Sequence, residues 1–267
     1  MKIKLISALE KCFLDDCIDS KEEYNRGSCL KEERFRFGVC YVNEELCWTA
    51  VPVLLTVKSE IAEHITVKRV EHVPVKLPAH GKANNVDYLR TTPGLYPDLL
   101  TPLNSHNRLS LSNNLESLLI EVDTKGIDKA GVYPIEFIFS DFNSKSFMSS
   151  VTFNLEIIDC VLPKQDLIYT QWFYCDCLMD YYGTKAFDEQ HWTIIENYIK
   201  TAVKNGLNMI LTPVFTPPLD TYVGGERNTT QLVDITVNNG KYSFNFDKLK
   251  RWIELCKRVG IEYFEIS

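Results

Sequence analysis

The sequence predicts a multidomain protein in which an all-β domain precedes an α/β domain. Strand-like segments fill the chain up to about residue 160, Leu162-Pro163-Lys164-Gln165 has the character of a linker, and strands alternate with helices beyond it. We therefore expect a first domain at 1–161 and a second at 162–267.

The first domain contains six predicted strands, each rich in aromatic and β-branched residues. They cover residues 35–42, 48–57, 65–75, 117–122, 132–139 and 149–158. Polar turns such as Asp123-Thr-Lys-Gly126 separate them, and no amphipathic helix pattern interrupts the series. Short strands joined by polar turns, without helices, predict an antiparallel β-sandwich.

The second domain alternates strands and helices. Its predicted elements are a strand at 167–174, a helix at 188–205, a strand at 207–215, a hairpin at 231–246 that turns at Asn238-Asn-Gly240, a helix at 247–259 and a strand at 261–266. Asp188 and Asp247 are the expected helix caps.

This order predicts a parallel sheet with right-handed crossovers, namely the first three strands and two helices of a (β/α)8 (TIM) barrel. A whole barrel needs about 250 residues, and about 100 follow the linker. We therefore expect a truncated barrel whose last strand is an exposed edge open to self-association.

Composition excludes several classes of protein. Of 267 residues, 45% are hydrophobic and 24% charged, which is typical of a globular chain. The net charge of -7 and the lack of a basic cluster argue against nucleic-acid binding. No apolar run approaches the ~18 residues that a membrane span requires. Nine cysteines without a CxxC pair, and an N-terminus without a signal-peptide pattern, predict reduced thiols and a cytoplasmic location, where the Asn228 glycosylation sequon has no role.

Several short motifs carry a family resemblance. They are Gln171-Trp-Phe-Tyr-Cys-Asp176, His191-Trp192, Ile194-Ile-Glu-Asn197, Met209-Ile-Leu-Thr-Pro213, Thr216-Pro-Pro-Leu-Asp220 and Gly224-Gly-Glu-Arg227, with Tyr96-Pro-Asp-Leu-Leu-Thr-Pro102 and Ala130-Gly-Val-Tyr133 upstream. With these motifs the chain resembles bacterial proteins of the "domain of unknown function 4091" group. That group is similar to glycoside hydrolase family 123, the β-N-acetylgalactosaminidases.

The resemblance implies a β-sandwich followed by a barrel that hydrolyses glycosides of 2-acetamido sugars, with a carbohydrate partner and no cofactor or metal. In that family the acetamido oxygen of the substrate attacks the anomeric carbon, and an adjacent Asp-Glu pair on a later barrel strand assists. The adjacent pair in this chain, Asp188-Glu189, precedes a helix and is better explained as a cap with a first-turn acid. No catalytic residue is identified, and we expect the chain to be inactive alone.

Substrate-binding candidates follow from the rule that barrels bind substrate at the carboxyl ends of their strands. Asp176, expected to end the first strand, would bind a sugar hydroxyl or fix its own loop. Glu226 and Arg227 lie in the long loop after the second strand and would bind substrate or form a surface ion pair. Glu265, near the end of the third strand, would be partly buried and would need a sugar or a basic side chain as partner.

Aromatic and thiol side chains near Asp176 suggest further roles. Trp172 would stack on a pyranose ring, as would Tyr174, although both are also compatible with a core position. Cys175 and Cys177 suggest zinc only weakly, because no complementary His or Cys pair accompanies them.

Two other functions stay open at this stage. One is a carbohydrate-binding module, which would need Tyr88, Tyr96 and Phe139 to form an exposed platform. The other is a fragment without activity of its own.

Overall fold

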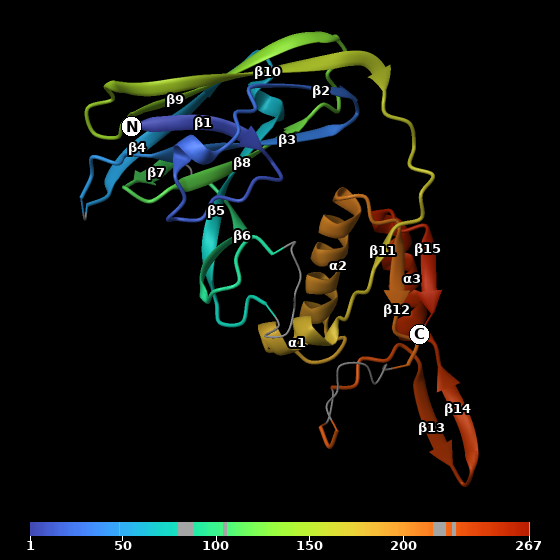
Figure 1. Cartoon of the computed structure of the whole chain (residues 1–267). Coiled ribbons are helices and arrows are strands. Elements are labelled where there is room, and N and C mark those ends of the chain that lie inside the picture. Colours follow the sequence, from blue (N-terminus) through green and yellow to red (C-terminus); the bar gives the residue numbers. More distant parts are fainter. Residues whose placement is uncertain (48, 80–87, 104–105, 216–222, 226–227, 267) are drawn as a thin grey trace. The chain divides into compact units, whose positions relative to one another are not determined.

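The computed structural model describes residues 1–47, 49–79, 88–103, 106–215, 223–225 and 228–266 (Figure 1). Two compact units divide the chain at Met1–Pro163 and Lys164–Ser267. These are unit 1 and unit 2.

Unit 1 consists of two five-stranded sheets. The first has the order β1-β3-β8-β5-β6, with bounds Lys2–Ser7, Arg34–Val42, Glu116–Asp123, Ile65–Val75 and Gly94–Pro102. The second has the order β2-β10-β9-β4-β7, with bounds Arg26–Lys31, Phe147–Val161, Gly131–Asp141, Val51–Lys58 and Arg108–Leu111. Two short 3-10 turns, η1 (Ile18–Ser20) and η2 (Ala62–His64), accompany them.

One hydrophobic core joins the two sheets of unit 1. Phe37 of β3 stacks on Phe153 of β10 with ring centroids 3.9 Å apart, and it meets Phe137 of β9 edge-on at 5.8 Å. All three rings are fully buried. Burial alternates along β10 from Phe153 to Ile157, which is the period-two pattern that identified this strand in the sequence.

The structure adds to the predicted strands of unit 1 and corrects their pairing. Each of the six predicted strands is present, but β1, β2, β6 and β7 were not predicted. All four are edge strands of their sheets. The pairing is not wholly antiparallel either, because β2 and β10 run parallel from the pair Arg26–Asn154 onward.

Unit 2 contains a three-stranded parallel sheet, three helices and a hairpin. The sheet has the order β11-β12-β15, with bounds Thr170–Gln171, Met209–Thr212 and Tyr263–Ile266. The helices are α1 (Asp176–Tyr182), α2 (Glu189–Lys204) and α3 (Asp247–Val259). Buried side chains of α2 and α3, including Trp192, Ile195 and Trp252, share a core with Ile210 of β12.

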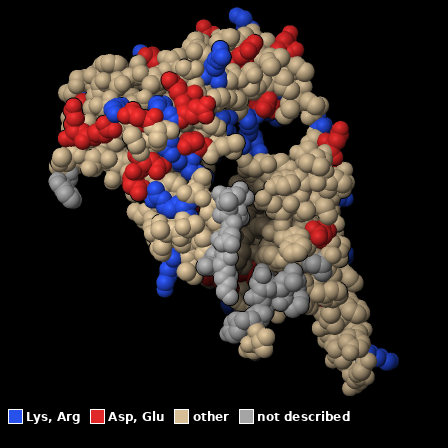
Figure 2. Space-filling model, viewed as in Figure 1, with Lys and Arg blue, Asp and Glu red and all other residues tan. Residues whose placement is uncertain are grey.

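The hairpin of unit 2 forms where the sequence predicts it. Strands β13 (Asp234–Asn238) and β14 (Lys241–Asn245) pair in register about Asn239 and Gly240. Both turn residues have positive φ, 49° and 75°, as the two-residue turns of hairpins require. The face of this hairpin seen in Figure 2 is largely free of charged atoms except at its tip.

Three local expectations for unit 2 are wrong. The first strand is limited to Thr170–Gln171, and a helix that was not predicted, α1, begins at Asp176. Asp247 is the first helical residue of α3, not its cap; its N–H donates to Asn245 Oδ1 at 2.7 Å. Asp188, in contrast, is confirmed as the cap of α2, since its Oδ1 accepts from His191 N–H at 2.7 Å.

Within the described ranges, none of the helices combines the length and apolar character needed to cross a membrane. On the face of unit 1 seen in Figure 2, acidic and basic side chains are interspersed.

Candidate functional site

The face of the parallel sheet that points away from the helices holds the candidate site. Ile210 of β12 and Phe264 of β15 are paired and pack in the core beneath the helices. Because side chains alternate along a strand, the next pair, Leu211 and Glu265, lies on the opposite face. In a barrel, this second face is the interior.

Trp172 directly follows the carboxyl end of β11, in register with Leu211 and Glu265. Gln171 pairs with Ile210, so the next residue, Trp172, comes level with Leu211 and therefore with Glu265. The Trp172 side chain is 60% exposed, and its ring meets Tyr174 edge-on at 6.5 Å. Tyr174, in contrast, is half-buried, and for both residues the choice between stacking and a core position stays a prediction.

Glu265 is half-buried near the end of β15. Among the residues that the structure describes, none forms an ion pair or hydrogen bond with its carboxylate. The structural Arg or Lys partner that the sequence offered as one alternative is therefore not found in the described part of the chain. A partly desolvated carboxylate is a strong acceptor for hydroxyl donors.

Asp176 differs from its expected position. It does not end a strand; it is the first residue of α1, and it is 8% exposed. The preceding residue, Cys175, is also buried, and burial raises the pKa of its thiol to about 12. The turn from β11 into α1 therefore buries a carboxylate two residues after Tyr174.

His191 holds this turn in place from beneath. It is fully buried on α2, where its Nδ1 accepts from Phe187 N–H at 2.9 Å. Nε2 must then carry the proton, and it donates to the carbonyl oxygen of Cys175 at 2.9 Å. One imidazole thus joins the start of α2 to the residue before Asp176.

The loop that returns after β12 is tied to the same turn. Thr230 of this loop is buried, and its side chain partly offsets the rise that burial causes in the pKa of the Cys175 thiol. Asn228 donates from Nδ2 to Asp180 Oδ1 of α1. The connections that follow β11 and β12 therefore meet at the carboxyl edge of the sheet.

Two other groups of residues from the sequence analysis remain. Glu226 and Arg227 lie outside the described residues, as do residues 216–220 of the resemblance. Glu189 forms two bonds of 2.7 Å to Arg251, which lies 4.7 Å from the Trp192 ring, so Asp188-Glu189 has the structural role that the sequence favoured.

The two thiols near Asp176 differ in exposure and have no further metal ligands beside them among the described residues. Cys175 is buried, whereas Cys177 is exposed and donates to the Tyr174 carbonyl at 2.8 Å. The described part of the chain contains no group of three or more His, Cys, Asp or Glu side chains placed to hold a metal ion.

Sequence reasoning did not identify His191, Leu211 or Thr230 as parts of the site. For His191 there was a usable signal, because a polar ring on the apolar face of a helix must find buried hydrogen-bond partners. For Leu211 and Thr230 there was none, since their roles depend on strand register and on the path of a loop.

Comparisons with known proteins find a family model that is similar to most of unit 2. Residues 172–267 match the sequence model of the catalytic domain of glycoside hydrolase 123. A comparison with curated proteins finds no match.

Among solved structures, the chain is similar to a family 123 glycoside hydrolase from Clostridium perfringens, studied for glycolipid glycan hydrolysis. The TM-score is 0.75 and the identity 15%, over 98% of this chain and 46% of that chain, so this chain spans less than half of its relative. The N-terminal domain of PorA matches with a TM-score of 0.29 and 10% identity, over 60% of this chain and 99% of that one, which is too weak to support an argument. Residues 172–267 thus match the family 123 catalytic domain in sequence, and nearly the whole chain is similar to a family 123 glycoside hydrolase in fold.

Proposed function

We propose that the chain is the first part of a glycoside hydrolase acting on 2-acetamido glycosides. In this proposal residues 1–161 are an accessory β-sandwich of the "domain of unknown function 4091" type, and residues 162–267 are the first part of a (β/α)8 barrel. The reaction is substrate-assisted and retaining, and its Asp-Glu pair is not among the residues of this chain. Because the C. perfringens relative was studied on glycolipid glycans, these are the first natural substrates to test.

The observation that carries the proposal is the row formed by Trp172, Leu211 and Glu265 across the inner face of the sheet. An exposed indole and a half-buried carboxylate on one face of a sheet are a combination that carbohydrate sites use. The aromatic face covers the C–H face of a pyranose, and the carboxylate accepts from its hydroxyls. We assign stacking to Trp172, hydroxyl binding to Glu265, and support of the loop to Asp176.

Among the described residues of unit 1, the three proposed platform residues do not favour the alternative of a binding module with an aromatic platform. Phe139 is fully buried, so it is not available to a ligand. Tyr96 packs edge-on against Phe13 at 5.3 Å, and its hydroxyl donates to the carbonyl of Thr92 at 2.7 Å. Of the three residues that the platform required, only Tyr88 is exposed.

A binding measurement tests the proposal. Methyl 2-acetamido-2-deoxy-β-galactoside is titrated into the chain and followed by NMR. Loss of a stacked aromatic ring costs roughly 0.5–1.5 kcal/mol, so Trp172→Ala should weaken binding up to about tenfold. Tyr181→Ala, which removes an aromatic ring that is 82% exposed on α1, is the matched control and should bind normally. No binding by the unmodified chain, or equal losses in both variants, would contradict the assignment.

Turnover is a separate question. Protonating a glycosidic oxygen requires a carboxylic acid within about 3 Å of it, and no such acid is assigned here. We expect no release of the aryl alcohol from aryl N-acetyl-β-galactosaminides by this chain. Turnover that Glu265→Gln abolishes would instead make Glu265 the catalytic acid.

A further inference from the structure

Two cysteines meet on the outer face of the first sheet of unit 1. Val39 and Tyr41 of β3 belong to the main core, so Cys40 between them faces the other side of the sheet. There it lies in a small buried cluster with Cys12, which is 1% exposed. The other members of the cluster are Ile6, Ile18, Val42 and Leu115.

Cys12 belongs to a connecting segment, residues 8–17, that crosses this face and is anchored on both sides. Its own carbonyl accepts from His72 Nε2 at 3.0 Å, and the Leu14 carbonyl accepts from Leu115 N–H at 3.0 Å. Lys21 Nζ, nearly buried, donates to the Lys11 carbonyl at 2.7 Å and pairs with Asp16 at 2.8 Å. These contacts hold Cys12 over β3.

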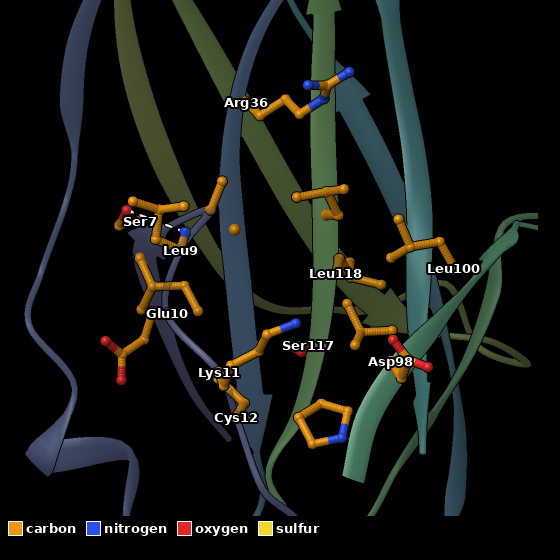
Figure 3. Close-up of a pocket in the computed structure, with 16 residues that line it drawn as sticks. Ser7, Leu9, Glu10, Lys11, Cys12, Arg36, Asp98, Leu100, Ser117 and Leu118 are labelled. Carbon is orange, nitrogen blue, oxygen red and sulfur yellow. Dashed lines mark hydrogen bonds between the residues drawn. The ribbon is translucent and has the colours of Figure 1, made fainter. Parts of the chain in front are cut away.

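A pocket of about 290 Å³ gives small molecules a route to this segment. As Figure 3 shows, Ser7 to Cys12 line one side of it, Leu118 lies behind, and Asp98 and Leu100 line the other side. Cys12 is therefore a lining residue although its own exposed area is small.

Cys12 and Cys40 share this buried cluster, and each thiol shifts the pKa of the other. Cys12 lines the pocket, whereas Cys40 does not line it and is fully buried, so Cys12 is the sulfur that a reagent reaches first. A neighbouring thiol in this relation is the arrangement in which an attacking thiolate and a resolving thiol convert to a disulfide.

We propose that Cys12 and Cys40 are an oxidisable dithiol that small-molecule disulfides convert to an intramolecular disulfide. The Cys12 thiolate attacks one sulfur of the reagent RSSR, forms a mixed disulfide and releases RS⁻. Cys40 gives its proton to the released RS⁻ and then attacks the Cys12 sulfur of the mixed disulfide. This attack releases the second RS⁻, which is protonated by solvent. The protein dithiol loses two electrons and two protons, and RSSR becomes two RSH.

The disulfide would fasten the 8–17 segment to the centre of the sheet. Closing a loop of about 30 residues restricts the unfolded chain, and for a unit of this size we expect the melting temperature to rise on the order of 10 °C. The effect should be confined to unit 1, because both cysteines lie within it.

The test uses the full chain with oxidised glutathione under native conditions, followed by alkylation, unfolding and peptide mapping without reduction. We expect a Cys12–Cys40 linked peptide and a rise in the melting temperature that dithiothreitol reverses. Cys29, buried in the same unit with its pKa raised to about 11 by burial, is the internal control and should stay alkylatable after unfolding.

Cys40→Ser separates the possible results. In this variant Cys12 should accept glutathione but form no internal bond, and the melting temperature should not rise. Recovery of both thiols unmodified from the wild-type chain after prolonged exposure would overturn the proposal. So would a link from Cys12 to the exposed Cys17 in place of Cys40.

Discussion

Replacing His191 by leucine tests how the candidate site is held together. Leucine fills the fully buried position with a side chain of similar size, but it is apolar and cannot form either hydrogen bond. The Phe187 N–H would lose its acceptor at 2.9 Å, and the Cys175 carbonyl would lose its donor at 2.9 Å. Both backbone groups would remain inside the core of unit 2.

The expected loss follows from two buried groups left without partners. Each costs about 1–3 kcal/mol, so unfolding free energy should fall by about 2–6 kcal/mol. Since a domain of this kind has about 5–15 kcal/mol in total, the change is large. The turn before Asp176 should loosen with it, because the Cys175 carbonyl is the point at which α2 holds that turn.

Urea unfolding followed by tryptophan fluorescence measures the loss, since Trp192 and Trp252 are buried in unit 2. Two milder variants divide the effect. His191→Asn can still accept from Phe187 N–H, and His191→Gln can still donate to Cys175, so each should recover about half of the lost stability. Gln190→Leu, at the exposed neighbouring position, is the control and should stay within about 0.5 kcal/mol of the wild type.

A His191→Leu protein with wild-type unfolding free energy would refute this reasoning. Unchanged amide exchange in the peptide containing Cys175 and Asp176 would do so independently. Either result would mean that the imidazole fills space without supporting the turn.

Four further predictions concern the rest of the chain. Backbone N–H donors of His191 and Lys185 lower the pKa of Asp188. The stabilising effect of this carboxylate is therefore present above its unfolded pKa of about 3.9 and is lost as pH falls through the lower folded pKa. In denaturant titrations, the stability difference between Asp188→Ala and wild type should shrink between about pH 7 and about pH 3. Phe37→Ala should destabilise unit 1 by about 3–5 kcal/mol, measured by near-UV circular dichroism, with Phe147→Ala on the surface as control. Limited proteolysis should cut near residues 160–166 and leave a resistant unit 1, whereas digestion throughout unit 1 would argue against a separate domain. Strand β15 pairs on one side with β12 and has no second neighbour among the described strands, so light scattering should detect concentration-dependent association.

The strands recognised in the sequence and those missed differ in their position in the sheets. Central strands such as β3, β8 and β9 pair with another strand on each side and lie in the middle of their sheets. Many of their side chains are buried there, so their sequences are dense in apolar residues. The four missed strands are edges; β6, for example, contains two prolines and exposes Leu95 and Leu99. An edge strand needs one set of backbone bonds and little burial, so its sequence carries a weak signal.

The candidate site shows the same division. Trp172 and Glu265 could be proposed because strand ends are visible in the sequence as the points where apolar runs stop. The strand register that brings them level through Leu211 could not be read, since it depends on pairings between residues 39 and 54 positions apart, Gln171 with Ile210 and Leu211 with Glu265. Asp176 was misplaced because its helix has seven residues, too few for a helical period to be recognised.

The sequence by itself therefore determined the features that depend on local pattern: the central strands, the cap of α2, the hairpin turn at Asn239-Gly240 and the motifs that resemble family 123. Tertiary structure alone decided which of these features meet. It paired His191 with Cys175, placed Leu211 between Trp172 and Glu265, and brought Cys12 against Cys40. The physical reason is that hydrophobic periodicity specifies which face of an element is buried, whereas contacts between distant segments are selected only when the whole chain packs.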